Sequence, residues 1–187
     1  MRIRLLFYFL IAYPISLPAQ KNRLVKALIP DHGTLQFAGG IGFLSGGIGY
    51  DSKTKRIQTD ILYGYVPQKL GGVTIHSITG KFTWIAVSSK LKNNIRADWL
   101  STGLLINYVF GKQYFFLSPD KYPLKYYGLP TAAHVGIFAG GGLRYKRAGV
   151  YYELGTTDRD LASYVGNIKA IPFFDIVNIG VGAKYFF

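Results

Sequence analysis

The sequence predicts an all-β protein, an antiparallel up-and-down transmembrane β-barrel of about eight strands. In segment after segment, every second residue is apolar, and the residues between are small, polar or singly charged. This period of two is that of a strand with one face in apolar and one in polar surroundings. Aromatic residues make up 16% of the 187 residues and glycine contributes 23, as in barrels whose apolar band lies between aromatic girdles. The strands of a soluble β-sandwich also alternate between apolar and polar residues, but we expect the exterior of such a protein to carry more charged residues than the polar faces of this chain do.

Four strands are predicted in the first half of the chain. The first has one face formed by Leu35, Phe37, Gly39, Ile41 and Phe43. A turn at residues 45–47 leads into a short second strand through Ile48 and Tyr50. The alternative is a single strand over residues 35–50, with the eighth strand then taken from residues 161–167. After a polar turn at 51–55, the third strand points outward with Ile57, Thr59, Ile61, Tyr63 and Tyr65, and the fourth covers residues 73–87.

Four more strands follow a charged connection at residues 88–98. The fifth, residues 99–110, has an outward face of Leu100, Thr102, Leu104, Ile106, Tyr108 and Phe110. After the irregular segment 111–130, the sixth has outward Val135, Ile137, Ala139, Gly141, Leu143 and Tyr145. A hairpin at 146–149 leads to the seventh, with Val150, Tyr152 and Leu154 outward. A loop at 158–175 precedes the terminal strand, which presents Val177, Ile179, Val181, Ala183, Tyr185 and Phe187.

An even number of strands places both ends of the barrel chain on one side of a membrane, and a closed sheet leaves no edge facing lipid. Counting back from the last strand, the turns at 51–55, 88–98 and 146–149 are predicted to be periplasmic. The connections at 67–72, 111–130 and 158–175 are predicted to be extracellular. The last two are long, as extracellular loops of such barrels usually are.

The first nineteen residues predict a cleavable signal peptide (residues 1–19). Arg2 and Arg4 precede an apolar core at residues 5–12, and a cleavage site follows Ala19. The apolar run is too short, and too broken by proline, to span a bilayer as a helix. Residues 20–33 form a periplasmic N-terminal segment, either one or two helical turns on the membrane or a disordered leader. Residues 34–187 form the barrel domain.

Charge and cysteine content restrict the partners. The formal net charge is +13, and loss of Arg2 and Arg4 with the signal lowers it by two. The basic residues lie in turns with no base-stacking motif among them, so we expect no nucleic acid. The chain contains no cysteine and therefore has no disulfide. Its histidines, His32, His76 and His134, are too scattered for a metal site, and we expect no cofactor.

The faces opposite the apolar ones predict a polar lumen. Its inward side chains are Gln36, Gln58, Asp60, Ser77, Thr79, Lys81, Thr83, Ser101, Asn107, His134, Arg144, Glu153, Asn178 and Lys184. An eight-stranded barrel is just filled by its side chains, and enclosed charges are costly unless paired. We therefore expect a lumen cluster of Asp60, Lys81, Arg144, Glu153 and Lys184, with Asp60 paired to Lys81 and Glu153 to Arg144 or Lys184. The other interpretation is a narrow pore past Asp60, Lys81 and Glu153.

The final twelve residues, IVNIGVGAKYFF, and the alternating segments before them resemble small outer-membrane β-barrels of Gram-negative bacteria, including those of the Bacteroidota. In that class a C-terminal strand ending in phenylalanine helps mark the chain for barrel assembly. The resemblance covers residues 35–187 and implies a multi-pass location in the outer membrane. It also implies contact with outer-membrane lipid or lipopolysaccharide, with the barrel assembly machinery, and with other outer-membrane proteins.

Two families of small outer-membrane barrels, the lipid A deacylases and palmitoyltransferases, use serine and histidine, so a lipid A-modifying enzyme is the alternative function. The deacylase family carries His-x-Ser on one strand. Here His76 and Ser77 are adjacent, which places them on opposite faces of a regular strand. His134 with Ser101, and Glu153 as the acid, is the next combination. No spacing supports it, and we assign no catalytic residue.

The segment 112–130 is the most distinctive surface. Aromatic side chains on a proline-stiffened loop bury much area at low entropic cost, so the loop is a candidate partner contact; the other interpretation is an interfacial girdle. Its aromatic residues are Tyr114, Phe115, Phe116, Tyr122, Tyr126 and Tyr127. The predicted function is a non-enzymatic barrel that stabilises the membrane or acts as an accessory subunit of an outer-membrane complex.

Overall fold

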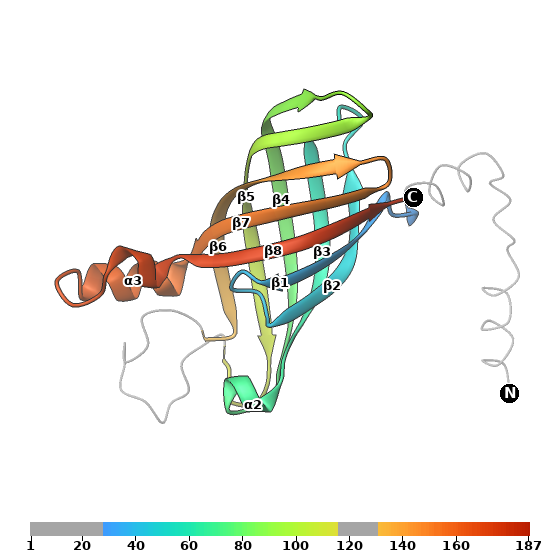
Figure 1. Ribbon diagram of the computed structural model, residues 1–187. Helices are drawn as coiled ribbons and strands as arrows, with labels where there is room; N and C mark the ends of the chain where they lie inside the picture. Colours follow the sequence, from blue (N-terminus) through green and yellow to red (C-terminus); the bar gives the residue numbers. More distant parts are fainter. Residues whose placement is uncertain (1–27, 116–130) are drawn as a thin grey trace, which may run out of the picture.

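The computed structural model, which describes residues 28–115 and 131–187, contains a closed eight-stranded antiparallel barrel (Figure 1). Each strand pairs with its neighbours in the sequence, and β1 closes the barrel on β8. The strands are β1 (His32–Ala38), β2 (Leu44–Asp51), β3 (Ile57–Val66), β4 (Ile75–Lys90), β5 (Ile95–Phe110), β6 (Ala133–Tyr145), β7 (Ala148–Thr157) and β8 (Asn178–Phe186). The predicted fold class, an all-β up-and-down barrel, is confirmed. The predicted signal peptide lies outside the described residues.

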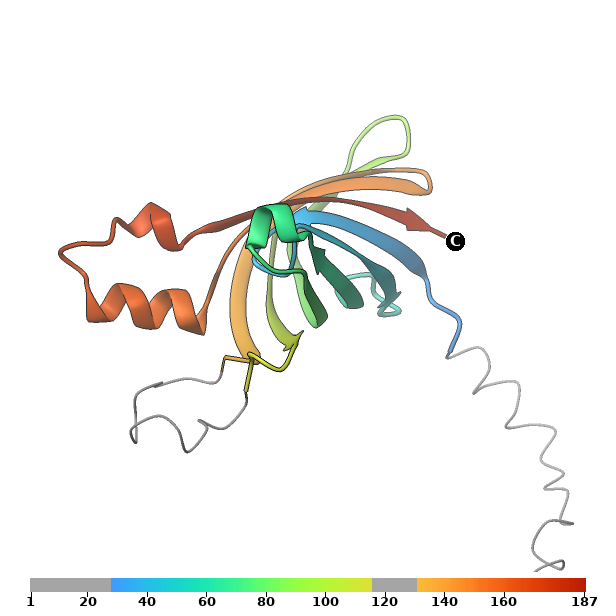
Figure 2. The same ribbon diagram turned by 90° about the horizontal axis from the view of Figure 1, so that it is seen from below.

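The barrel has two different ends. The proximal end holds the start of β1, the end of β8 and three short turns at residues 52–56, 91–94 and 146–147. The distal end holds the turn at 39–43, the helix α2 (Gln68–Gly71), and the excursion formed by α3 (Asp158–Gly166) and η1 (Phe173–Ile176). In Figures 1 and 2 this excursion projects from the barrel on the side away from the C-terminus. The connections are thus grouped as the predicted topology requires.

The first turn differs from the prediction. It lies at residues 39–43, where Gly39, Gly40 and Gly42 have φ values of 81°, 75° and 147°, a region open to glycine but strained for other residues. The predicted turn at 45–47 is instead regular strand within β2. Glycine is needed at Gly47 for a different reason, because a Cβ there would fall against the backbone of Ile61 on the neighbouring strand. Residues 35–50 therefore form two strands.

This shift also changes which face some side chains occupy. Ile41, predicted to point outward, is buried inside the barrel, because the turn interrupts the alternation that starts at Leu35. Ile41 belongs to a small apolar cluster with Leu62, Leu105 and Phe138. The interior is therefore polar over most of its length, with one apolar layer that the prediction missed.

The connection predicted at residues 88–98 is much shorter. β4 continues to Lys90 and β5 begins at Ile95, and a tight turn uses Asn93 and Asn94 at φ values of 62° and 61°. Asparagine is one of the residues that tolerate this left-handed conformation. Charged residues assigned to a loop, Arg96 and Asp98 among them, are therefore strand residues at the proximal mouth.

The predicted loop at 158–175 contains a helix. Thr157 is the N-cap of α3: its side chain accepts a hydrogen bond from the backbone N–H of Asp160, while the Asp160 carboxylate binds back to Thr157. This reciprocal arrangement is a capping box, which stabilises the first turn of a helix. Residues 161–167 therefore do not supply the eighth strand, which is β8.

The outward face of the barrel is apolar and exposed. Large side chains predicted to point outward are exposed on all of β1, β3, β5, β6, β7 and β8: Leu35, Phe37, Ile57, Ile61, Tyr63, Tyr65, Leu100, Leu104, Ile106, Tyr108, Phe110, Val135, Ile137, Leu143, Tyr145, Val150, Tyr152, Leu154, Ile179, Val181 and Tyr185. The buried polar side chains lie on the opposite face of the same sheet. The barrel is therefore apolar on the outside and polar in most of its interior.

Candidate functional site

Two ion pairs cross the lumen of the barrel. Asp60 on β3 binds Lys184 on β8, with 2.9 Å between carboxylate oxygen and Nζ. Lys81 on β4 binds Glu153 on β7, with Nζ at 2.6 Å from each carboxylate oxygen. Neither pair joins neighbouring strands, so both pairs tie opposite walls of the barrel together.

Asp60 is the centre of the first network. Its Oδ1 accepts a hydrogen bond from Thr34 at 2.6 Å and lies 2.9 Å from Nε2 of His32. The other ring nitrogen of His32 lies 3.3 Å from Asp51. Gln58 donates to Asp51 at 3.0 Å and accepts from Lys184 at 3.0 Å. Each buried carboxylate is thus matched by donors, as enclosed charge requires.

Lys81 is the centre of the second network. Besides Glu153, its ammonium donates to Gln36 Oε1 at 2.9 Å. The hydroxyl of Tyr151 donates to the same oxygen, also at 2.9 Å. The ammonium lies 4.7 Å from the ring centroid of Phe138, so the apolar layer also faces this charge. The long lysine stem lets a residue of β4 reach acceptors on β1 and β7.

The structure brings four of the five predicted lumen residues together and corrects their pairing. Asp60 and Lys81 are direct partners in the β3–β4 register, yet each bonds a residue across the lumen. Glu153 pairs with Lys81, and neither Arg144 nor Lys184 is its partner. Arg144 is separate from this group: it lies at the proximal mouth, where its Nε donates to the carbonyl of Lys146.

Asp51 was assigned to the turn at 51–55, and three further members of the networks were not singled out from the sequence. His32 and Thr34 precede Gln36 at a spacing of two and so share its face, but residues up to 33 were assigned to a leader segment. Tyr151 lies between two outward residues, Val150 and Tyr152, and alternation alone places it inward. The sequence signal for all three is the strand period.

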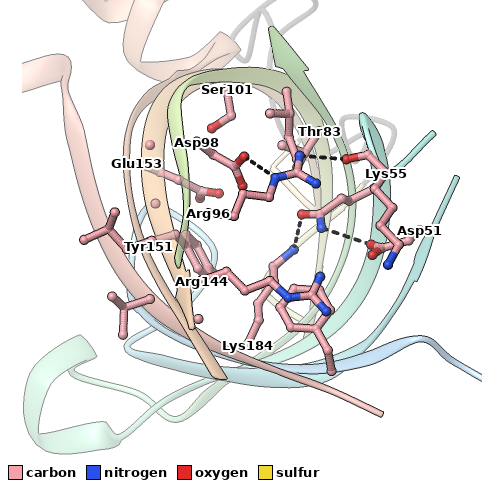
Figure 3. Close-up of a pocket in the computed structure, with 18 residues that line it drawn as sticks. Asp51, Lys55, Thr83, Arg96, Asp98, Ser101, Arg144, Tyr151, Glu153 and Lys184 are labelled. Atoms are coloured by element: carbon pink, nitrogen blue, oxygen red, sulfur yellow. Dashed lines mark hydrogen bonds and ion pairs between the residues drawn. The ribbon is translucent and has the colours of Figure 1, made fainter. Parts of the chain in front are cut away.

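The interior is closed along the path that a pore would need. Asp60, Lys81 and Glu153 are 1%, 3% and 7% exposed, and all three are engaged in the ion pairs above. At the proximal mouth lies a small cavity of about 60 Å³ (Figure 3), enough for a few water molecules but too small for a drug-sized organic ligand. The lumen is filled by a side-chain plug.

The candidate catalytic residues do not form a catalytic group. His76 lies on the outer wall, where its Nδ1 bonds the hydroxyl of Tyr63 at 2.5 Å, whereas Ser77 is buried and donates to the carbonyl of Ile41. His134 is at the distal end, 3.3 Å from Asp158, and Ser101 lines the proximal cavity. Among the described residues, neither histidine has a serine partner.

The aromatic segment can be placed only at its start. Tyr114 and Phe115 are half-buried at the distal end; the Phe115 carbonyl accepts a hydrogen bond from the backbone N–H of Thr131, and the Phe115 N–H donates to the Thr131 hydroxyl. The other candidate contact residues, Phe116, Tyr122, Tyr126 and Tyr127, lie outside the described residues.

Within residues 28–115 and 131–187, no group of acidic, histidine or cysteine side chains is arranged to hold a metal ion. No helix in that part of the chain is long and apolar enough to cross a membrane.

Comparisons of the chain with models of protein families, with curated proteins and with solved structures found no match.

Proposed function

We propose that the protein is an integral outer-membrane β-barrel of Gram-negative type, exported by a cleavable signal peptide, with a structural or accessory role and no catalytic one. The observation that supports this most is the polarity of the wall. Large apolar side chains are exposed around the outside, while carboxylates, lysines and amides fill the interior. Contiguous apolar surface of this extent is rare on soluble monomers, whose patches reach a few hundred Å².

The distribution of aromatic residues along the strands agrees with two membrane interfaces. Exposed aromatic residues occur toward the proximal end (Trp99, Tyr145, Tyr185 and Phe187) and toward the distal end (Phe37, Phe43, Tyr63, Tyr65, Tyr108 and Phe110). The band between them is mostly aliphatic, with Leu104, Ile137 and Val181, and it also contains two exposed aromatic residues, Phe82 beside Leu104 and Tyr152 beside Val181. Girdles of aromatic residues flanking an aliphatic band are typical of barrels that contact lipid.

A filled lumen favours a structural or accessory role over transport. A partner would then contact the outer surface of the protein, and the most distinctive part of that surface lies at the distal end. The α3–η1 excursion exposes Val165, Ile168 and Phe174 outside the barrel wall, at the same end as the start of the aromatic segment. We therefore place the contact with another outer-membrane protein at the distal end. The outer wall would contact lipid, and the barrel assembly machinery would recognise β8.

Extraction of the native protein from membranes in mild detergent tests this role. A partner is expected to co-migrate with the wild-type barrel and to be lost from the V165S/I168S/F174S variant, since the latter removes exposed apolar contacts. The control is L70S/V73S, which alters exposed apolar residues of the α2 loop at the same end. Recovery of wild type as a monomer alone would contradict the subunit role and leave the purely structural one.

A further inference from the structure

The proximal mouth has a charge arrangement that the plug does not explain. Arg96 on β5 and Arg144 on β6 are direct partners in the strand register, and both line the same cavity. Like charges directly opposite each other in a sheet are destabilising. Figure 3 shows both side chains turned toward the interior of the barrel.

Arg144 has no carboxylate partner among the described residues. Its Nε donates to the carbonyl of Lys146, and its guanidinium carbon lies 3.4 Å from the ring centroid of Phe186. Phe186 is buried and therefore a fixed platform. Of the five N–H groups of an arginine, only the one on Nε has an acceptor in the described part of the chain. The stacked guanidinium is thus held in place with its terminal N–H groups unused.

The carboxylates near this mouth are engaged elsewhere. Asp98 accepts from Arg96 at 2.8 Å. Asp51 faces His32 and Gln58, and Asp31 accepts from the backbone N–H of Asp51. Arg96 also donates to the carbonyl of Lys55 at 3.0 Å. The positive charge of Arg144 is therefore left without a carboxylate bound to it.

The surrounding rim has the same sign of charge. The three proximal turns contain six basic residues and no acidic one: Lys53, Lys55, Arg56, Lys92, Lys146 and Arg147. The described connections of the distal end instead mix four basic residues, Lys69, Lys112, Arg159 and Lys169, with three acidic ones, Asp158, Asp160 and Asp175. The cavity itself is lined by four cations, Arg96, Arg144, Lys55 and Lys184, against three carboxylates, Asp51, Asp98 and Glu153. These carboxylates are engaged by other side chains, so the basic rim and the excess of cations favour an anion at that cavity.

We propose that the proximal mouth is a binding site for a phosphate-type oxyanion, held by the guanidinium of Arg144 and supported by Arg96. The planar fork of arginine matches phosphate oxygens two at a time. Stacking on Phe186 fixes that fork before the ligand arrives. The anion also offsets the repulsion between the two facing arginines. The site does not require that the barrel be in a membrane, so its failure would leave the proposed function intact.

Titration of the purified barrel in non-ionic detergent with inorganic phosphate, at constant ionic strength set by chloride, tests the site. R144Q is expected to weaken binding by about tenfold or more, the value of a lost charge-assisted hydrogen bond. R147Q is the control, because Arg147 is an exposed arginine of the adjacent turn that does not line the cavity. R147Q is expected to bind as wild type does, and R144K, which keeps the charge without the fork, to be intermediate.

Heat-modifiable migration of each variant on a gel confirms that it remains folded. Equal weakening in R144Q and R147Q, or no phosphate binding beyond that of chloride, would overturn the proposal in favour of a diffuse basic rim. The source of the anion is resolved in nanodiscs of phosphatidylcholine with and without phosphatidic acid. If the headgroup of phosphatidic acid occupies the site, inorganic phosphate no longer binds in the discs that contain this lipid, and the site is assigned to a lipid headgroup. Unchanged phosphate binding in those discs assigns the site to a soluble phosphate. Both results support the site.

Discussion

Replacing Lys81 by methionine is expected to destabilise the barrel by about 3–5 kcal/mol, the cost of leaving a buried charge without its partner. The ammonium of Lys81 is the ion-pair partner of Glu153 and donates to Gln36 across the lumen. Methionine fills a similar volume, so the loss arises from charge and hydrogen bonding and not from a cavity. The free energy of unfolding, measured by urea titration of tryptophan fluorescence in detergent micelles, reports the change.

Two further variants separate the ion pair from the substitution itself. K90M changes an exposed lysine at the end of the same strand and is expected to have little effect. The double variant K81M/E153L removes both charges, and such replacement of a buried pair by apolar residues is often neutral or stabilising. It should therefore recover most of the stability lost in K81M. A double variant as unstable as K81M would contradict the assignment of Glu153 as the partner.

Replacing Leu104 by arginine is expected to destabilise the barrel in a bilayer by about 2–4 kcal/mol, the range for a basic residue near the middle of a lipid-facing strand. Leu104 lies within β5 and is 54% exposed on the outer wall. If that wall contacted water, an exposed leucine would accept arginine with a change within about 0.5 kcal/mol. The size of the effect therefore depends on what surrounds the wall.

Leu91 provides a matched control. It is 44% exposed, similar to Leu104, but lies in the proximal turn after β4. L91R is expected to cost no more than about 1 kcal/mol, because the penalty falls off toward the interface. Equal small costs for L91R and L104R in phospholipid vesicles would mean that the band around Leu104 does not contact acyl chains.

The strand period accounts for the part of the fold that could be predicted. Alternation fixed which side chains of β3, β5 and β6 point outward, because each residue of a regular strand alternates between the two faces. Alternation fails where the chain leaves the strand. Gly39, Gly40 and Gly42 allow a turn where the pattern predicts strand, whereas Gly47, which looks similar in the sequence, is needed for close packing against Ile61 in the sheet.

The pairing inside the lumen could be predicted only in part. The inward location of Asp60, Lys81, Glu153 and Lys184 follows from the period of two. Their partners do not, because register relates only neighbouring strands, and these ion pairs join β3 to β8 and β4 to β7. Which walls face each other depends on the curvature of the closed sheet and on the length of the lysine side chains.

The helix α3 shows a signal that was available in the sequence. Thr157 followed three residues later by Asp160 resembles a capping box, and Leu161 and Val165 are four residues apart, a helical spacing. The opposed pair Arg96 and Arg144 could not be recognised, because it depends on the register between β5 and β6 after the shift between Asp98 and Ser101.

The contact between the outer wall and lipid acyl chains is tested most directly by fluorescence quenching. The chain contains no cysteine, so L104C and L91C can each be labelled at a single site with a bimane probe and reconstituted in lipid with bromine deep in the acyl chains. We predict strong quenching of the probe at position 104 and weak quenching at position 91. Equal and weak quenching at both positions, in a barrel that remains folded, would contradict a membrane-spanning wall.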